Sequence, residues 1–104
     1  SNDIQLSLFE ALAKLFKRLS EQNLVTELNQ KGNVPEILAA LIFDPRYEGL
    51  SEALRVKWAQ AIVALAALPA LARPVLDEKL EGLIEQERST SVRQELEKAR
   101  KALA

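Results

Sequence analysis

The sequence predicts an all-α protein, and three observations support this prediction. The 104-residue chain is 48% hydrophobic and 28% charged, with only three Gly and four Pro, which favours long helices over disorder. Its apolar residues are mostly Leu and Ala, which are strong helix formers, while β-branched residues are sparse. These apolar residues recur every three or four positions, the spacing of one helix face. A chain of this length is expected to form one domain over residues 1–104.

The segment 51–68 is the helix around which the others are expected to pack, because it is apolar on two sides. Ser51 is its predicted N-cap. One stripe comprises Leu54, Trp58, Ala61, Ile62, Leu65 and Leu68, and the other comprises Val56, Ala59, Val63, Ala66 and Ala67. A helix of this kind needs neighbours on both flanks, so Trp58 and Val63 should both be buried between separate layers.

Two helices are predicted before residue 33. The first begins near Asp3 as N-cap and has one apolar face. Its stripe comprises Ile4, Leu8, Leu12, Leu15 and Leu19, with Phe9 and Phe16 near the edge. The phase of the apolar pattern changes after residue 19, which predicts a break at 20–23 and a short second helix that ends before Gly32.

Three further helices are predicted in the rest of the chain besides 51–68. One begins at Val34 and Pro35 and stops before Asp44, where a turn follows. After Pro69, residues 70–73 should link to a helix opened by Pro74, within which Gly82 indicates close contact with a neighbour. The last helix is predicted from a capping box at 91–94. Its apolar face comprises Val92, Leu96, Ala99 and Leu103.

Paired helices recur with a period near 40 residues. Pro35 and Pro74 each open a helix, and Ser51 and Ser91 each cap the next one. This period is close to that of HEAT and armadillo units. Residues 90–103, a polar turn followed by Val-Arg and then small and leucine positions, resemble the second helix of a HEAT-type repeat. The resemblance implies a short right-handed HEAT/armadillo-like solenoid of five to six helices that presents a surface to another macromolecule. The alternative is a compact helical bundle that homodimerises or docks on DNA.

The composition excludes most catalytic mechanisms. The chain has no Cys and no His, so thiolate nucleophiles, disulfides and the commonest general base and zinc ligand are excluded. Four carboxylates on one predicted helix suggest either an acid–base pair or metal site, or a solvated acidic face: Asp77, Glu78, Glu81 and Glu85. The solvated acidic face is favoured, because no metal-binding motif accompanies these carboxylates. We therefore expect no catalysis and no cofactor.

The expected partner is another protein. A net charge of −1 provides no general attraction to nucleic acid, and the longest apolar run, residues 61–72, is too short to span a membrane. Phe9 and Phe16 are candidates for an exposed partner-binding or self-association edge, although burial under the following helices is the favoured interpretation. Arg46 and Tyr47 are candidates for ligand contact in a turn, where packing over a helix junction is the alternative.

The chain is also expected to be part of a longer protein. It starts with Ser1 and contains no Met, which suggests a piece of a longer protein. We expect this protein to act in the cytoplasm as a scaffolding or interaction module.

Overall fold

The computed structural model describes residues 2–22, 33–43 and 49–104, and over these ranges every regular element is helical. The helices are α1 (Asn2–Gln22), α3 (Val34–Phe43), α4 (Glu52–Ala66), α5 (Pro69–Leu76), α6 (Leu80–Gln86) and α7 (Thr90–Leu103). The all-α prediction is confirmed. The predicted second helix and Gly32 lie outside the described residues.

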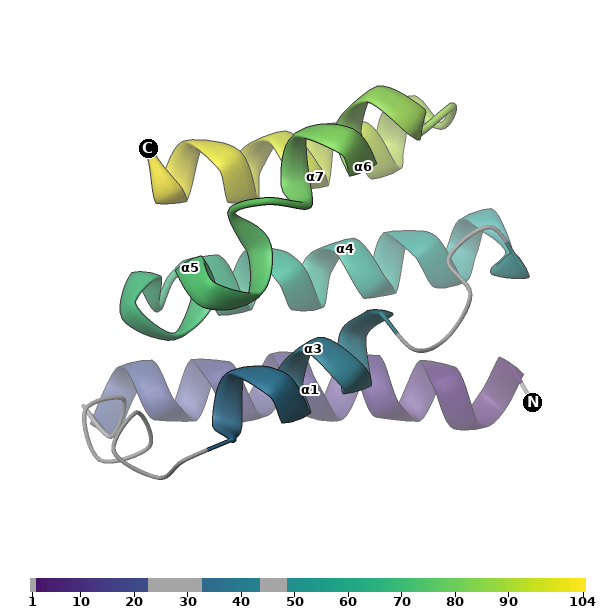
Figure 1. Ribbon diagram of the computed structural model, residues 1–104. Coiled ribbons are helices and arrows are strands. Elements are labelled where there is room, and N and C mark those ends of the chain that lie inside the picture. The colour runs from purple at the N-terminus through teal and green to yellow at the C-terminus, as the bar shows by residue number, and fades with distance from the viewer. Residues whose placement is uncertain (1, 23–32, 44–48) are drawn as a thin grey trace.

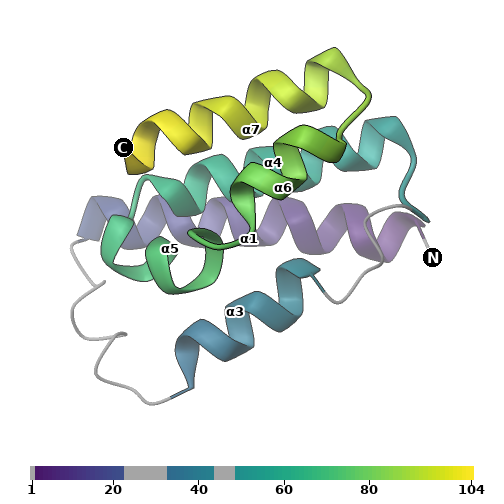
Figure 2. The same cartoon turned by 45° about the horizontal axis from the view of Figure 1, so that its top comes forward.

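The helices form two layers (Figures 1 and 2). Helices α1, α4 and α7 lie in one layer and run in the same direction, while α3 and the α5–α6 segment run back in the other layer (Figure 1). Helix α4 packs against both α1 and α7, as its two apolar stripes require. The arrangement is an open stack that grows by helix pairs, which confirms the predicted helical-repeat architecture.

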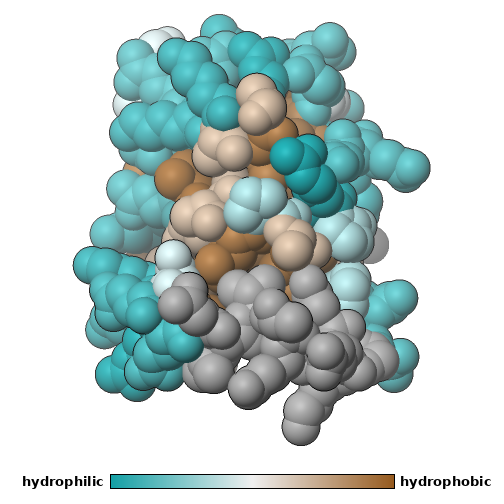
Figure 3. Space-filling view, turned by 90° about the vertical axis from the view of Figure 1, so that its left-hand side faces the viewer, coloured by the Kyte–Doolittle hydropathy of each residue, from teal (hydrophilic) through white to brown (hydrophobic). Residues whose placement is uncertain are grey.

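The core lies between the two layers. Figure 3, seen from the side where α4 turns into α5, shows apolar side chains in the middle of this face, with hydrophilic ones above them and on both flanks. Trp58 is 1% exposed, and its indole Nε1 donates a hydrogen bond to the carbonyl oxygen of Ile42 in α3 at 2.8 Å. This bond ties α4 to the opposite layer.

The second stripe of α4 is only partly covered. Ala59 and Ala66 are fully buried, and such small side chains allow a neighbouring helix backbone to approach closely. Val63 is half-buried and packs against the edge of the core. The expectation of two buried sides is therefore confirmed for Trp58 and holds only in part for Val63.

The buried face of α1 is rotated from the predicted stripe. Its core positions are Phe9, Leu12, Phe16 and Leu19, whereas Ile4 and Leu15 are exposed. Leu12 and Leu19 belong to both stripes, so spacing alone fits either choice. Burying two aromatic rings removes more apolar surface from water, and this selects the observed face. Asp3 lies inside the first helical turn, so its prediction as N-cap is wrong.

The helix boundaries after α4 also differ from the prediction. Helix α5 starts at Pro69, so residues 70–73 are helical instead of a linker, and Pro74 lies inside the helix. Proline suits a first helical position because its missing N–H has no intrahelical acceptor there. Residues 77–79 then form a turn before α6.

The last helix is capped by Ser89 and not by Ser91. The Ser89 hydroxyl accepts a hydrogen bond from the backbone N–H of Val92 at 3.4 Å. In the same way, the Ser51 hydroxyl accepts one from the backbone N–H of Leu54 at 3.3 Å. The interval between equivalent caps is therefore 38 residues instead of 40. At this offset the buried positions of α4 and α7 coincide, pairing Leu54 with Val92, Trp58 with Leu96, Ala61 with Ala99 and Leu65 with Leu103.

Each of these two helices also carries an arginine one residue after its first buried position. Arg55 donates to the carbonyl oxygen of Leu50 at 2.7 Å, and Arg93 donates to the carbonyl oxygen of Glu87. Each guanidinium thus holds the segment that enters its helix. The cap and its arginine together form a structural repeat within the chain.

Gly82 provides a first test of the packing. A Cβ atom built there would meet nothing within 4 Å, so the predicted close contact with a neighbour is wrong. We expect Gly82→Ala to raise the free energy of unfolding by about 0.5–1 kcal/mol, because alanine restricts the unfolded chain and favours the helix. Urea denaturation would measure this change, and a loss of stability would contradict the open environment of Gly82.

Candidate functional site

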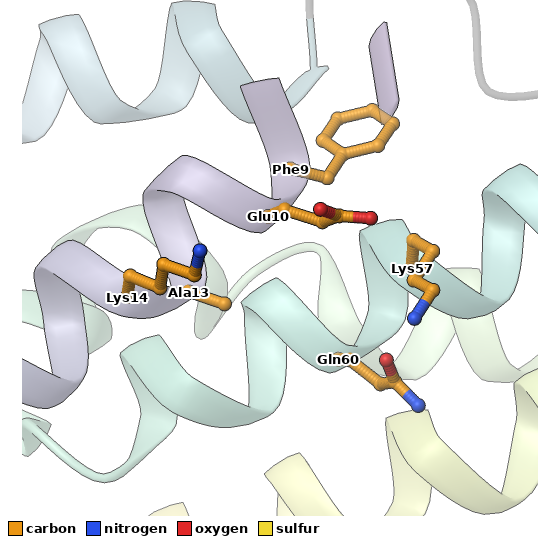
Figure 4. A pocket seen from close by; sticks show the side chains of 6 residues that line it. All are labelled: Phe9, Glu10, Ala13, Lys14, Lys57 and Gln60. Atoms are coloured by element: carbon orange, nitrogen blue, oxygen red, sulfur yellow. The ribbon is translucent and has the colours of Figure 1, made fainter. Parts of the chain in front are cut away.

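A groove of about 340 Å³ lies between α1 and α4. It is lined by Phe9, Glu10, Ala13, Lys14, Lys57 and Gln60. Figure 4 shows side chains of α1 on one wall and those of Lys57 and Gln60 from α4 on the other. The groove is therefore built by two helices of the same layer, where they meet solvent.

Helical spacing explains why these residues gather. Glu10 and Lys14 are four residues apart on α1, and Lys57 and Gln60 are three apart on α4, so each pair occupies one helix face. All four are exposed, whereas Phe9 is almost completely buried at the floor. The small side chain of Ala13 leaves space between the walls. The site thus combines an apolar floor with a polar rim.

The rim has the chemistry of a recognition site. Two lysine ammonium groups supply positive charge and donors, the Gln60 amide both donates and accepts, and Glu10 accepts. This set suits the backbone of a polypeptide together with an acidic side chain. Within the described ranges, no group of three or more Asp or Glu side chains is placed to hold a metal ion.

The family comparison agrees with the helical-repeat fold. The sequence matches the family described as ECM29, C-terminal ARM-like repeats, over residues 1–102. The chain belongs to this family. Membership confirms the HEAT/armadillo-type resemblance predicted from residues 90–103 and from the repeating helix pairs. No curated protein and no solved structure matches the chain.

In this ARM-like chain the candidate partner-binding residues occupy different environments from those considered above. Phe9 and Phe16 are 1% and 0% exposed, so they do not form an exposed edge. Phe9 still contributes to the site, as the floor of the groove. Arg46 and Tyr47 lie outside the described residues. Lys14, Lys57 and Gln60 were missed, because exposed polar residues on a helix look alike until a neighbouring helix makes them a wall.

The four acidic candidates, Asp77, Glu78, Glu81 and Glu85, are all exposed, and no three of them are placed to hold a metal ion. Asp77 and Glu81 line a shallow cavity of about 210 Å³ beside Arg100 of α7. Glu81 pairs with Arg100, with 3.2 Å between its Oε1 and the guanidinium Nη1. This solvated pair joins α6 to α7, and its carboxylate has a structural role.

A buried carboxylate that the sequence did not reveal joins two ARM-like helix pairs. Glu87, 3% exposed, follows α6 and lies 3.2 Å from the Arg55 Nε of α4. Its Oε1 also accepts from the Ser89 backbone N–H at 2.9 Å. The carboxylate therefore connects α4 to the segment that enters α7. The only sequence signal for it is the arginine that recurs after each cap.

No helix among the described residues combines the length and apolar character required to cross a membrane.

Proposed function

We propose that this ARM-like chain is a non-catalytic interaction module of the cytoplasm, which binds an acidic segment of a partner polypeptide in the α1–α4 groove. The supporting observation is the groove itself, with its apolar floor and its rim of Lys14, Lys57, Gln60 and Glu10. A rigid two-layer stack holds these side chains on helices, so little order has to be created on binding.

The rim favours a polypeptide over nucleic acid. Glu10 stands among the lysines and would repel a phosphate backbone, and the chain as a whole carries a net charge of −1. The aromatic side chains of the described residues are buried or half-buried, so they provide no platform on which bases could stack. An acidic peptide instead can pair with Lys14 and Lys57 while its backbone meets Gln60.

Charge reversal in the groove tests this proposal. We expect selection from a phage-displayed library of random peptides to enrich acidic sequences that bind the wild-type chain. Lys57→Glu should raise the Kd of a selected peptide about tenfold or more, because attraction becomes repulsion. Fluorescence anisotropy with the labelled peptide would measure the change, and added salt should weaken wild-type binding.

The matched control is Arg73→Glu, which makes the same charge change at an exposed position of α5 in the other layer. It should leave the Kd close to that of the wild type. Equal losses in both variants would indicate a general charge effect and contradict binding in the groove. Selection that yields no acidic binders would contradict the proposed ligand.

A further inference from the structure

Large hydrophobic side chains reach solvent at one end of the stack. Among the described residues, Ile4, Leu15 and Ile37 are the exposed large hydrophobic ones, at 70%, 46% and 55%. They come from α1 and α3, one helix of each layer. Figure 1 shows that these two helices form the end of the stack opposite α7. Such concentration at one edge is uncommon on a surface that stays in water.

The α1 part of this edge is a continuous stripe. Ile4, Leu8, Ala11 and Leu15 follow one another at helical spacings of four, three and four residues. Ala11 is exposed and Leu8 is half-buried. The stripe lies on the flank of α1 opposite Ala13, which faces α4 across the groove. We call these four residues and Ile37 the α1–α3 edge.

The other end of the stack has a different character. The outward side of α7 carries polar side chains, among them Gln94, Glu97 and Lys101. Covering the α1–α3 edge with α7 of another copy would bury these groups against Ile4 and Leu15, which costs desolvation without new partners. Head-to-tail stacking of identical chains is therefore unfavourable. The complementary apolar surface that the described part of the chain offers is the edge itself.

We propose that two copies of the chain associate through their α1–α3 edges about a two-fold axis. A two-fold axis places the same patch on both sides of the interface, so apolar surface meets apolar surface. If the α1 helices pair antiparallel, Ile4 lies opposite Leu15 of the other copy, and Leu8 lies opposite Ala11. The small Ala11 lets the helices approach closely, while Ile37 extends the contact into the second layer.

Sedimentation equilibrium at micromolar to millimolar concentrations tests the proposal. The wild type should approach twice the 11.6 kDa mass of one chain. Leu15→Glu and Ile37→Glu should each raise the dimer dissociation constant roughly tenfold or more, because a charge would be buried in an apolar contact. Ala102→Glu, at an exposed position of α7, is the matched control and should dimerise like the wild type.

Far-UV circular dichroism establishes that each variant remains folded, which is expected because both substituted positions are exposed. The chain has no native cysteine, so introduced thiols report contacts directly. Ile4→Cys combined with Leu15→Cys should oxidise to a linked dimer in the antiparallel arrangement. A wild type that stays monomeric at the highest concentration overturns the proposal, as does a Leu15→Glu variant that dimerises as strongly as the wild type. Lys57 belongs to α4, across the groove on the other flank of α1, so Lys57→Glu should leave the dimer unchanged. This result would separate the dimer surface from the groove.

Discussion

Trp58→Ala is expected to lower the free energy of unfolding by about 3–5 kcal/mol, a large part of the stability of a small domain. The side chain is buried where α4 meets α3, and its ring lies edge-on to Phe43 with 6.4 Å between centroids. Alanine would leave a cavity there and remove the indole N–H that donates to the Ile42 carbonyl oxygen. Urea denaturation followed by far-UV circular dichroism would measure the loss.

A second variant separates the contribution of the Trp58 ring volume to stability from that of its hydrogen bond. Trp58→Phe retains an aromatic ring but removes the donor, and it should cost less than alanine, about 1–3 kcal/mol. Phe16→Leu offers a comparison on α1, where a buried ring has no hydrogen bond to lose. If Trp58→Ala unfolded at the same urea concentration as the wild type, the central position of α4 in the stack would be wrong.

Glu87→Ala is expected to lower the free energy of unfolding by about 2–3 kcal/mol. The substitution leaves the Arg55 guanidinium without its carboxylate and the Ser89 N–H without its acceptor. The Arg55 side chain is 20% exposed and also donates to Leu50, so water and that carbonyl oxygen reduce the loss. Because Glu87 joins α4 to the start of α7, hydrogen exchange should increase most at the N-terminal turn of α7.

The control for Glu87 is a carboxylate in an exposed ion pair. Glu81→Ala breaks the pair with Arg100, whose side chains are 63% and 44% exposed, and should cost about 0–1 kcal/mol. A double-mutant cycle with Arg55→Met would give the coupling between Arg55 and Glu87. A coupling near zero, or an equal cost for Glu81→Ala, would show that the buried pair has no special role.

Several elements could be predicted from local pattern because their signals are chemical and short-range. Ser51 caps α4 as expected, since a serine hydroxyl can accept from the N–H three residues later. The apolar face of the last helix is likewise correct, with Val92, Leu96 and Ala99 all buried. The two apolar sides of residues 51–68 indicated an inner helix with neighbours on both flanks, which is the feature from which the stack follows.

Choices between equally periodic alternatives could not be predicted. The α1 stripe with Ile4 and Leu15 and the stripe with Phe9 and Phe16 share the same spacing, so periodicity alone does not decide between them. Packing against α4 and the burial of two aromatic rings decide it. The capping box at 91–94 predicted Ser91 as the cap of the last helix, whereas Ser89 is the cap in the structure. Ser89 is favoured as the cap because the carboxylate of Glu87 accepts a hydrogen bond from the backbone N–H of Ser89. That carboxylate is held in place by Arg55, which is distant in the chain.

The candidate site depended still more on the tertiary structure. Lys14 and Lys57 are 43 positions apart, and each looks like an ordinary exposed residue of its own helix. The sequence by itself determined that the chain is helical, where its central helix lies and that this helix needs cover on both flanks, because these follow from interactions within a few turns. The tertiary structure decided which side of α1 faces the core, and thereby both the groove and the exposed α1–α3 edge. Rotation of a helix about its axis is set by the surfaces that pack against it.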